Sequence, residues 1–453
     1  MGVEKMGKRA KKLEELNQIM SGHVIDEFEK INVIILKELV NEAEEISDPR
    51  DSAYVRHKLS DILIIMLFAV MANADEWTGV EAFGKKKEKW LRKFLTLEFG
   101  VPTDDTYRIV MSMLNVTYVY RILLDFFIRK VTEVVTIYTE TPKNPEREII
   151  SLDGKVSNGS KRQKTDKPGA KALHTLNAYS SDWGMCVEQE FISEKSNEIP
   201  AMPVLINRLN IAGSILTWDA LNTQKETVKA VIEGKGDYVG ALKGNQGAMF
   251  EDVRDYFDEE VLSGIKTPSK EGGQPEKYIK TVELEHSAIV TREYFLETEI
   301  DWLYGRQEWL GLKSIGVEIK KIEKLQETKE PVYEKRYFIT SVTDTNEFAR
   351  AVRGHWGIEN GLHWHLDTTF KDDKNTTMKN NGAKGLQLIK KLALALLKIA
   401  QVLYPARTSI KMIRYRLCLD YEPEIEKYFP LFPLKVSERF LPNNPICFMF
   451  GQG

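Results

Sequence analysis

The sequence predicts an all-helical N-terminal domain followed by a mixed α/β domain that carries a β-rich insertion. Three observations support this fold class. Helical patterning dominates residues 1–140, short β-rich runs alternate with helical segments beyond Pro142, and residues 250–334 become irregular with strand-like alternation. A chain of 453 residues is long enough for two or three such domains.

The first 140 residues are expected to form a domain of short helices. We predict helices over 9–46, near 57–73, over 85–97 and from Pro102 to about residue 115. Short helices with capped starts and basic flanks suit DNA recognition. They suit any small helical bundle equally well, so this domain does not by itself indicate a function.

The composition is that of an ordinary globular protein. Three widely spaced cysteines (Cys186, Cys418 and Cys447) argue against a disulfide framework or a thiolate zinc site and favour a cytoplasmic protein. The apolar run beginning at Ile62 is shorter than the ~20 residues that a membrane span needs, so we expect a buried helix and no membrane association. The net charge of −3 conceals local basic runs, one of which spans Lys155–Lys171 with six cations and one acid.

Residues 141–249 and 335–403 are expected to form one α/β core, interrupted by the insertion. Its predicted elements, in order, are a strand over 146–153, a hairpin over 171–192, a helix over 199–210, a strand over 213–219, a helix over 225–236, a strand over 237–243, and, after the insertion, a strand over 335–341 and a final helix. This is the element order of a ribonuclease-H-like core. Residues 404–453 are expected to form a Pro-rich C-terminal tail.

Two aspartates follow predicted core strands. Asp153 ends the run Ile149–Leu152, and Asp219 ends the run Ile215–Trp218. Reactive groups gather at strand ends in α/β sheets, because the sheet fixes them while the loops leave access. An acid at the end of a strand is also a common turn residue, so each aspartate alone is a weak signal.

Glu359 lies in a helix predicted to begin at Asp344, which has capping-box spacing with Glu347. At three- and four-residue spacing, one face of this helix carries Phe348, Val352, Trp356, Glu359 and His363. A carboxylate in that apolar stripe would be costly to bury unless a cation or donor met it. The alternatives are a structural pair with Arg353 or a side chain in solvent, and Asp367 is a rival third acid.

Three carboxylates suit the chemistry of phosphodiester cleavage. The reaction needs an activated water or 3′-hydroxyl and neutralisation of charge on the leaving oxygen, which two Mg²⁺ ions about 3.5–4 Å apart supply. Mg²⁺ prefers carboxylate oxygens to imidazole or thiolate ligands. Asp153, Asp219 and Glu359 are therefore the candidate catalytic and metal-binding residues.

At these residues the sequence resembles the DDE transposases of bacterial insertion sequences, in the branch that includes the H-repeat-associated proteins. The motifs that carry the resemblance are LDGKVSNGS, EKSNEIPAMPVLINRL, WDALNTQ, KGDYVGALKGNQG and RGHWGIENGLHWHLD, and it covers roughly residues 45–400. The resemblance implies a magnesium-dependent DNA-cutting enzyme, with Mn²⁺ able to substitute, and puts the triad on Asp153, Asp219 and Glu359. Where relatives show Tyr, Arg and Lys around the glutamate, this chain has Val352, His355 and Leu366, and Asn158 replaces a basic residue in the first motif.

Candidate DNA contacts lie near the three acids. They are Lys155, Lys161 and Arg162 in the basic run, Lys243 and Asn245 after a core strand, and Arg353 and His355 on the helix that bears Glu359. The cluster of histidines and tryptophans at 355–365 has three interpretations: packing beside the site, stacking of Trp364 or Trp218 on a displaced base, or a zinc site using Glu359 and His363.

By the same resemblance, the N-terminal domain is expected to bind terminal inverted repeats in double-stranded DNA, and the catalytic domain to cut there and join the freed 3′-hydroxyl to target DNA. A homodimer on paired DNA ends is expected by analogy. Two rivals remain open: a domesticated DNA-binding protein that no longer transposes, and a general metal-dependent nuclease with the same core.

Overall fold

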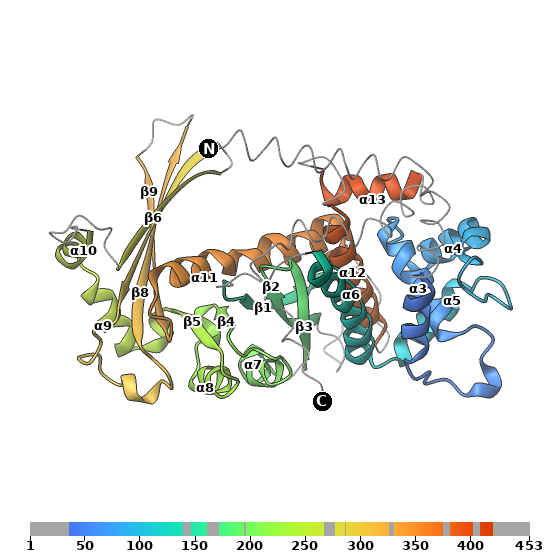
Figure 1. Ribbon diagram of the computed structural model, residues 1–453, viewed down its shortest axis with the longest axis horizontal. Helices are drawn as coiled ribbons and strands as arrows, with labels where there is room; N and C mark the ends of the chain where they lie inside the picture. The colour runs from blue at the N-terminus through green and yellow to red at the C-terminus, as the bar shows by residue number, and fades with distance from the viewer. Residues whose placement is uncertain are drawn as a thin grey trace. The chain divides into compact units, whose positions relative to one another are not determined.

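A computed structural model describes residues 36–138, 146–160, 172–193, 196–266, 277–285, 287–325, 330–374, 381–401 and 408–419 (Figure 1). These residues divide into two compact units, one helical and one built on a single large sheet. The mixed α/β fold with a helical N-terminal region, predicted from the sequence, is confirmed.

The helical unit is built around one completely buried helix. Its helices are α3 (Leu59–Met71), α4 (Trp77–Leu91), α5 (Asp104–Met113), α6 (Val116–Tyr138), α12 (Gly382–Ala400) and α13 (Ile410–Leu419). Every residue of α3 is buried, as expected for the apolar run. α12 packs against α3, α5 and α6, although the sequence analysis assigned residues 335–403 to the catalytic domain. A helix with an apolar stripe fits either unit, so its sequence alone does not decide which unit buries it.

Among the described residues, no single helix has both the length and the apolar character needed to cross a membrane. In the described part of the chain, one pair, α5 with the first part of α6, passes that test by length and composition, and these two helices are bent by 100° relative to one another.

The second unit contains a sheet of nine strands. They are β1 (Ile149–Ser157), β2 (Leu173–Ser180), β3 (Met185–Ile192), β4 (Ile215–Trp218), β5 (Asp237–Leu242), β6 (Tyr278–Glu285), β7 (Ala288–Glu297), β8 (Ser314–Lys324) and β9 (Val332–Thr340). Their order across the sheet is β3-β2-β1-β4-β5-β9-β8-β7-β6. The antiparallel meander of β1, β2 and β3, followed by parallel β4 and β5, is the ribonuclease-H-like arrangement that the sequence predicts.

The insertion extends the core sheet. After α9 (Ala248–Tyr256) and α10 (Glu259–Lys266), strands β6, β7 and β8 form an antiparallel meander with β9, and β9 pairs with β5 of the core. The β-rich character expected for residues 250–334 is therefore present, and its strands belong to the same sheet as β1 and β4.

Helices cover both faces of the core strands. α7 (Glu198–Ile206) and α8 (Lys225–Glu233) lie on one face, and α11 (Thr345–Ile358) crosses the other (Figure 1). α11 begins where the sequence predicts, because the Asp344 side chain accepts a hydrogen bond from the Glu347 backbone N–H at 2.8 Å. Its Phe348 ring packs so closely on Gly316 of β8 that a Cβ there would lie 2.4 Å from the ring. This contact anchors α11, and so the position of Glu359 at its end, to the sheet.

Candidate active site

Asp153 and Asp219 lie beside one another because two neighbouring strands run parallel. Leu152 of β1 pairs with Trp218 of β4, so each aspartate is the next residue along its strand. Asp219 follows the last residue of β4, as predicted. The prediction that the first strand ends at Asp153 was wrong: β1 continues to Ser157, because residues beyond Asp153 still pair with β2.

Glu359 lies at the C-terminal end of α11, where the helix passes into a π-helical turn over Glu359–His363. Such turns widen the helix locally and are frequent at functional sites. The Glu359 side chain is 54% exposed, which matches the alternative of a side chain in solvent and not that of a carboxylate buried in the apolar stripe. In the described contacts Arg353, the suggested structural partner, pairs with Glu283 and Glu285 of β6.

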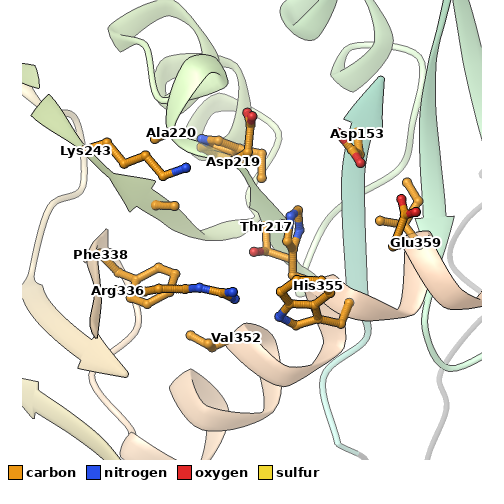
Figure 2. A pocket seen from close by; sticks show the side chains of 14 residues that line it. Asp153, Thr217, Asp219, Ala220, Lys243, Arg336, Phe338, Val352, His355 and Glu359 are labelled. Carbon is orange, nitrogen blue, oxygen red and sulfur yellow. The ribbon is translucent and has the colours of Figure 1, made fainter. Parts of the chain in front are cut away.

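The structure brings Asp153 and Glu359 together, with His363 beside them. One potential ligand atom from each of these three residues lies within 4.8 Å of the other two. Asp219 lines the same cavity, whose volume is about 490 Å³. Figure 2 shows Asp153 and Glu359 pointing toward one another, across the cavity from Lys243 and Arg336.

The Asp219 carboxylate takes part in a local turn. It caps the short helix Ala220–Asn222 by accepting from the Asn222 backbone N–H, and its Oδ1 also accepts from Asn222 Nδ2 at 3.0 Å. The same Asn222 amide nitrogen donates to Glu198 Oε2 at 2.7 Å. One amide side chain thus connects two carboxylates that lie 21 residues apart in sequence.

Glu198, the first residue of α7, is a further acid near Asp153 and Asp219. Asn197 caps α7, and the Glu198 side chain points to the site, where His174 Nε2 lies 3.0 Å from its Oε1. A Cβ at residue 154 would lie 1.9 Å from the same oxygen, so a larger residue there would require the Glu198 side chain or the strand to move. The signal for Glu198 available in the sequence was its place in the motif EKSNEIPAMPVLINRL, one of those that carry the resemblance.

The electrostatics of the site favour a bound cation. Burial, together with the nearby carboxylates of Glu198, Asp219 and Glu359, raises the pKa of Asp153 to about 7. Burial likewise raises the pKa of Asp219. Carboxylates that disfavour one another's charge are stabilised by a divalent ion among them, and their oxygens are the donors that Mg²⁺ prefers. The residues present therefore fit a hard divalent cation.

Asp367, the rival third acid, is engaged elsewhere. Its Oδ1 lies 2.5 Å from Lys155 Nζ, and the Lys155 side chain is only 6% exposed. The ion pair therefore involves both Asp367, a candidate metal ligand, and Lys155, a candidate DNA contact. Two further candidates in the same basic run, Lys161 and Arg162, lie outside the described residues.

The remaining candidate DNA contacts have different surroundings. Lys243 is exposed and lines the cavity, whereas Asn245 donates from Nδ2 to the Ala220 carbonyl at 2.8 Å and so supports the loop after Asp219. Arg353 is held by its two glutamates on β6. Burial, together with the neighbouring Arg336 charge, lowers the pKa of His355 to about 4, so His355 is neutral and offers no positive charge to a phosphate.

Two family models match the chain in sequence order. Residues 41–127 match the model described as DDE_Tnp_1-associated, and residues 144–396 match the one described as transposase DDE domain. YncI from Escherichia coli O157:H7 is 33% identical over 366 residues, covering 80% of this chain and 88% of YncI. The H repeat-associated protein YhhI from Escherichia coli K12 is 31% identical over 370 residues, covering 80% of this chain and 90% of YhhI.

Among solved structures, the chain is similar to the piggyBac transposase in its synaptic complex with hairpin DNA. The sequence identity is 11% and the TM-score is 0.34, with 90% of this chain and 80% of that chain covered. A likeness at that level adds nothing to what the family matches show.

Proposed function

This chain belongs to the family of transposases that carry the DDE domain, and from that membership we propose that it cuts DNA at insertion-sequence ends and joins the freed 3′-hydroxyl to target DNA. The observation that carries the proposal is the convergence of Asp153, Asp219 and Glu359 on one cavity from three separate elements. No nucleophilic side chain is needed for this reaction, because water and then the DNA hydroxyl attack phosphorus.

Asp153, Asp219 and Glu359 would hold two Mg²⁺ ions, with Mn²⁺ as a substitute. The ions would supply charge neutralisation on the scissile phosphate and lower the pKa of the attacking water or hydroxyl. The raised pKa of Asp153 supports this assignment, because it marks a carboxylate whose negative charge lacks compensation from the protein. Lys243, on the other wall of the cavity, carries charge of the sign that a DNA backbone requires, whereas the neighbouring Arg336 is paired with Glu318 and Glu334.

The proposed division of labour follows the two units. Residues 1–140 would recognise the terminal inverted repeats in double-stranded DNA, and the unit with the sheet would carry out the chemistry. Both ends of an element must be cut together, so we propose that a homodimer assembles on paired ends.

A cleavage and strand-transfer assay tests the proposal. The substrates are duplexes bearing the native element ends and an unrelated duplex of equal length, each with Mg²⁺ and with EDTA. We expect cutting of the native ends by the parent protein, a strand-transfer product, and neither with Asp219→Asn. Asp255→Asn is the matched control, since Asp255 is 67% exposed and pairs only with the adjacent Arg254 among the contacts described.

The rival functions give different results in the same assay. A domesticated DNA-binding protein would bind the duplexes that carry the native element ends but would not cut them. A general nuclease would cut the unrelated duplex equally well and would produce no strand-transfer product. Either result would overturn the proposal.

A further inference from the structure

His363 lies beside two carboxylates of the site, those of Asp153 and Glu359. Its Nδ1 lies 3.1 Å from Glu359 Oε2 and 3.6 Å from Asp153 Oδ2. The ring is buried, with a side chain only 6% exposed, and it sits four residues after Glu359 on the same π-helical turn. One ring nitrogen therefore faces both acids.

The other ring nitrogen identifies the tautomer. His363 Nε2 lies 3.4 Å from Nδ2 of Asn177, a fully buried side chain on β2 opposite Asp153 in the sheet register. The orientation of the Asn177 amide is set by its other contacts: Nδ2 donates to the Thr175 carbonyl at 3.2 Å, and Cys186 Sγ lies 3.9 Å from Oδ1. The group facing Nε2 is thus a donor, so Nε2 accepts and Nδ1 carries the hydrogen.

This arrangement differs from that of a metal-ligating histidine. A ligating ring donates its second N–H to an acceptor such as a carbonyl or carboxylate, which leaves the lone pair of the first nitrogen for the ion. Here the second nitrogen meets an amide N–H, and the first nitrogen has its hydrogen directed at a carboxylate. We propose that His363 is a positioning residue that holds Glu359 beside Asp153 through Nδ1–H, and that it does not ligate the ion.

The physical benefit is preorganisation. Two neighbouring carboxylates repel one another. The Glu359 side chain is also half-exposed, and without a hydrogen-bond partner it would sample several rotamers. A hydrogen bond from a buried ring restricts Glu359 to the rotamer that faces Asp153, so less conformational freedom is lost when a cation binds.

The inference rests on the proposed function, and metal affinity tests it without an activity readout. We would measure Mn²⁺ binding to the full chain by calorimetry. Loss of a hydrogen bond to a ligand typically lowers metal affinity by about 10- to 100-fold, and we expect this for His363→Ala and His363→Gln. His363→Asn should recover most of the affinity, because the asparagine amide nitrogen can occupy the position of Nδ1, whereas that of glutamine reaches toward the position of Nε2. His365→Ala is the matched control from the next turn, where Nδ1 contacts Thr369 Oγ1 at 3.2 Å.

Pulsed electron paramagnetic resonance of bound Mn²⁺ supplies the spectroscopic readout. We expect no directly coordinated ¹⁴N in the parent protein and the same spectrum in His365→Ala. A coordinated nitrogen that disappears in His363→Asn would make His363 a ligand and overturn the proposal. Unchanged affinity in His363→Ala, or equal affinities in the Asn and Gln variants, would also overturn it while leaving the proposed function standing. A parent protein that binds no Mn²⁺ would contradict the proposed function itself.

Discussion

Lys155 and Asp367 form an ion pair that joins β1 to the segment after Glu359, with 2.5 Å between Nζ and Oδ1. The pair lies two residues beyond Asp153 on one side and eight residues beyond Glu359 on the other. It therefore helps to fix the relative position of the two elements that carry Asp153 and Glu359.

Because Asp367 is paired with Lys155, we expect substitutions of Glu359 and Asp367 to have different effects on DNA cleavage. Glu359→Gln should abolish cleavage of the native DNA ends. Asp367→Asn should keep measurable cleavage and lose about 1–2 kcal/mol of unfolding free energy, because it leaves the buried Lys155 ammonium with a weaker acceptor. Cleavage assays and guanidinium denaturation measure the two effects. Equal loss of cleavage in both variants would restore Asp367 as a candidate ligand.

A substitution at Gly154 should disturb the site through Glu198. The Cβ of Gly154→Ala would lie 1.9 Å from Glu198 Oε1, so either the strand shifts or the contacts of Glu198 with His174 and Asn222 break. We expect a loss of about 1–3 kcal/mol in unfolding free energy. Gly244→Ala, on the same unit, is the control, because a Cβ at residue 244 would have no other atom within 4 Å. The double variant Gly154→Ala/Glu198→Ala should regain stability relative to Gly154→Ala, and failure to do so would contradict the proposed clash.

Glu148, buried at the start of β1, should make stability depend on pH. Burial raises its pKa to about 8, above the value near 4.5 expected in the unfolded chain. Between these two values the folded protein holds a proton that the unfolded chain releases, so the unfolding free energy falls as pH rises from about 4.5 to about 8. Glu148→Gln keeps an acceptor for the Ser180 hydroxyl and removes the titration.

Denaturation of metal-free protein at pH 5, 6.5 and 8 is the appropriate measurement, comparing the parent with Glu148→Gln. The stability difference between the two should shift in favour of the variant as pH rises. Parallel pH profiles would show that Glu148 is ionised in the folded protein across this range.

Substitutions of the two candidate DNA contacts Lys243 and Arg353 should change the salt dependence of DNA affinity differently. Lys243 is exposed at the cavity, and its replacement by Gln should lower DNA affinity and reduce the slope of log affinity against log salt concentration by about 1. Arg353→Gln should leave the slope unchanged, because its charge is already met by Glu283 and Glu285. Fluorescence anisotropy with labelled end duplexes measures both slopes, and a reduced slope for Arg353→Gln would show that the arginine leaves its glutamates to bind DNA.

Much of the site-bearing core was predictable because it depends on local patterns. The runs before Asp153 and Asp219 are apolar and β-rich, and the cap at Asp344 has a recognisable spacing. Prediction was less successful where long-range contacts decide the outcome. β1 extends beyond Asp153 because β2 pairs with it, and α12 joins the helical unit because α3, α5 and α6 offer it an apolar surface.

The sequence by itself determined which residue types are present for the chemistry, and it determined the strands and the helix that bear Asp153, Asp219 and Glu359. Periodicity and capping are read from neighbours within a few positions, so these features are encoded locally. Only the tertiary structure decided that Glu198 and His363 lie close to the predicted acids of the site. It also decided that Lys155 forms an ion pair with Asp367, and that Arg353 forms ion pairs with glutamates of β6. Such pairings depend on strand register and helix packing, which bring together side chains separated by many residues and leave no periodic trace in the chain.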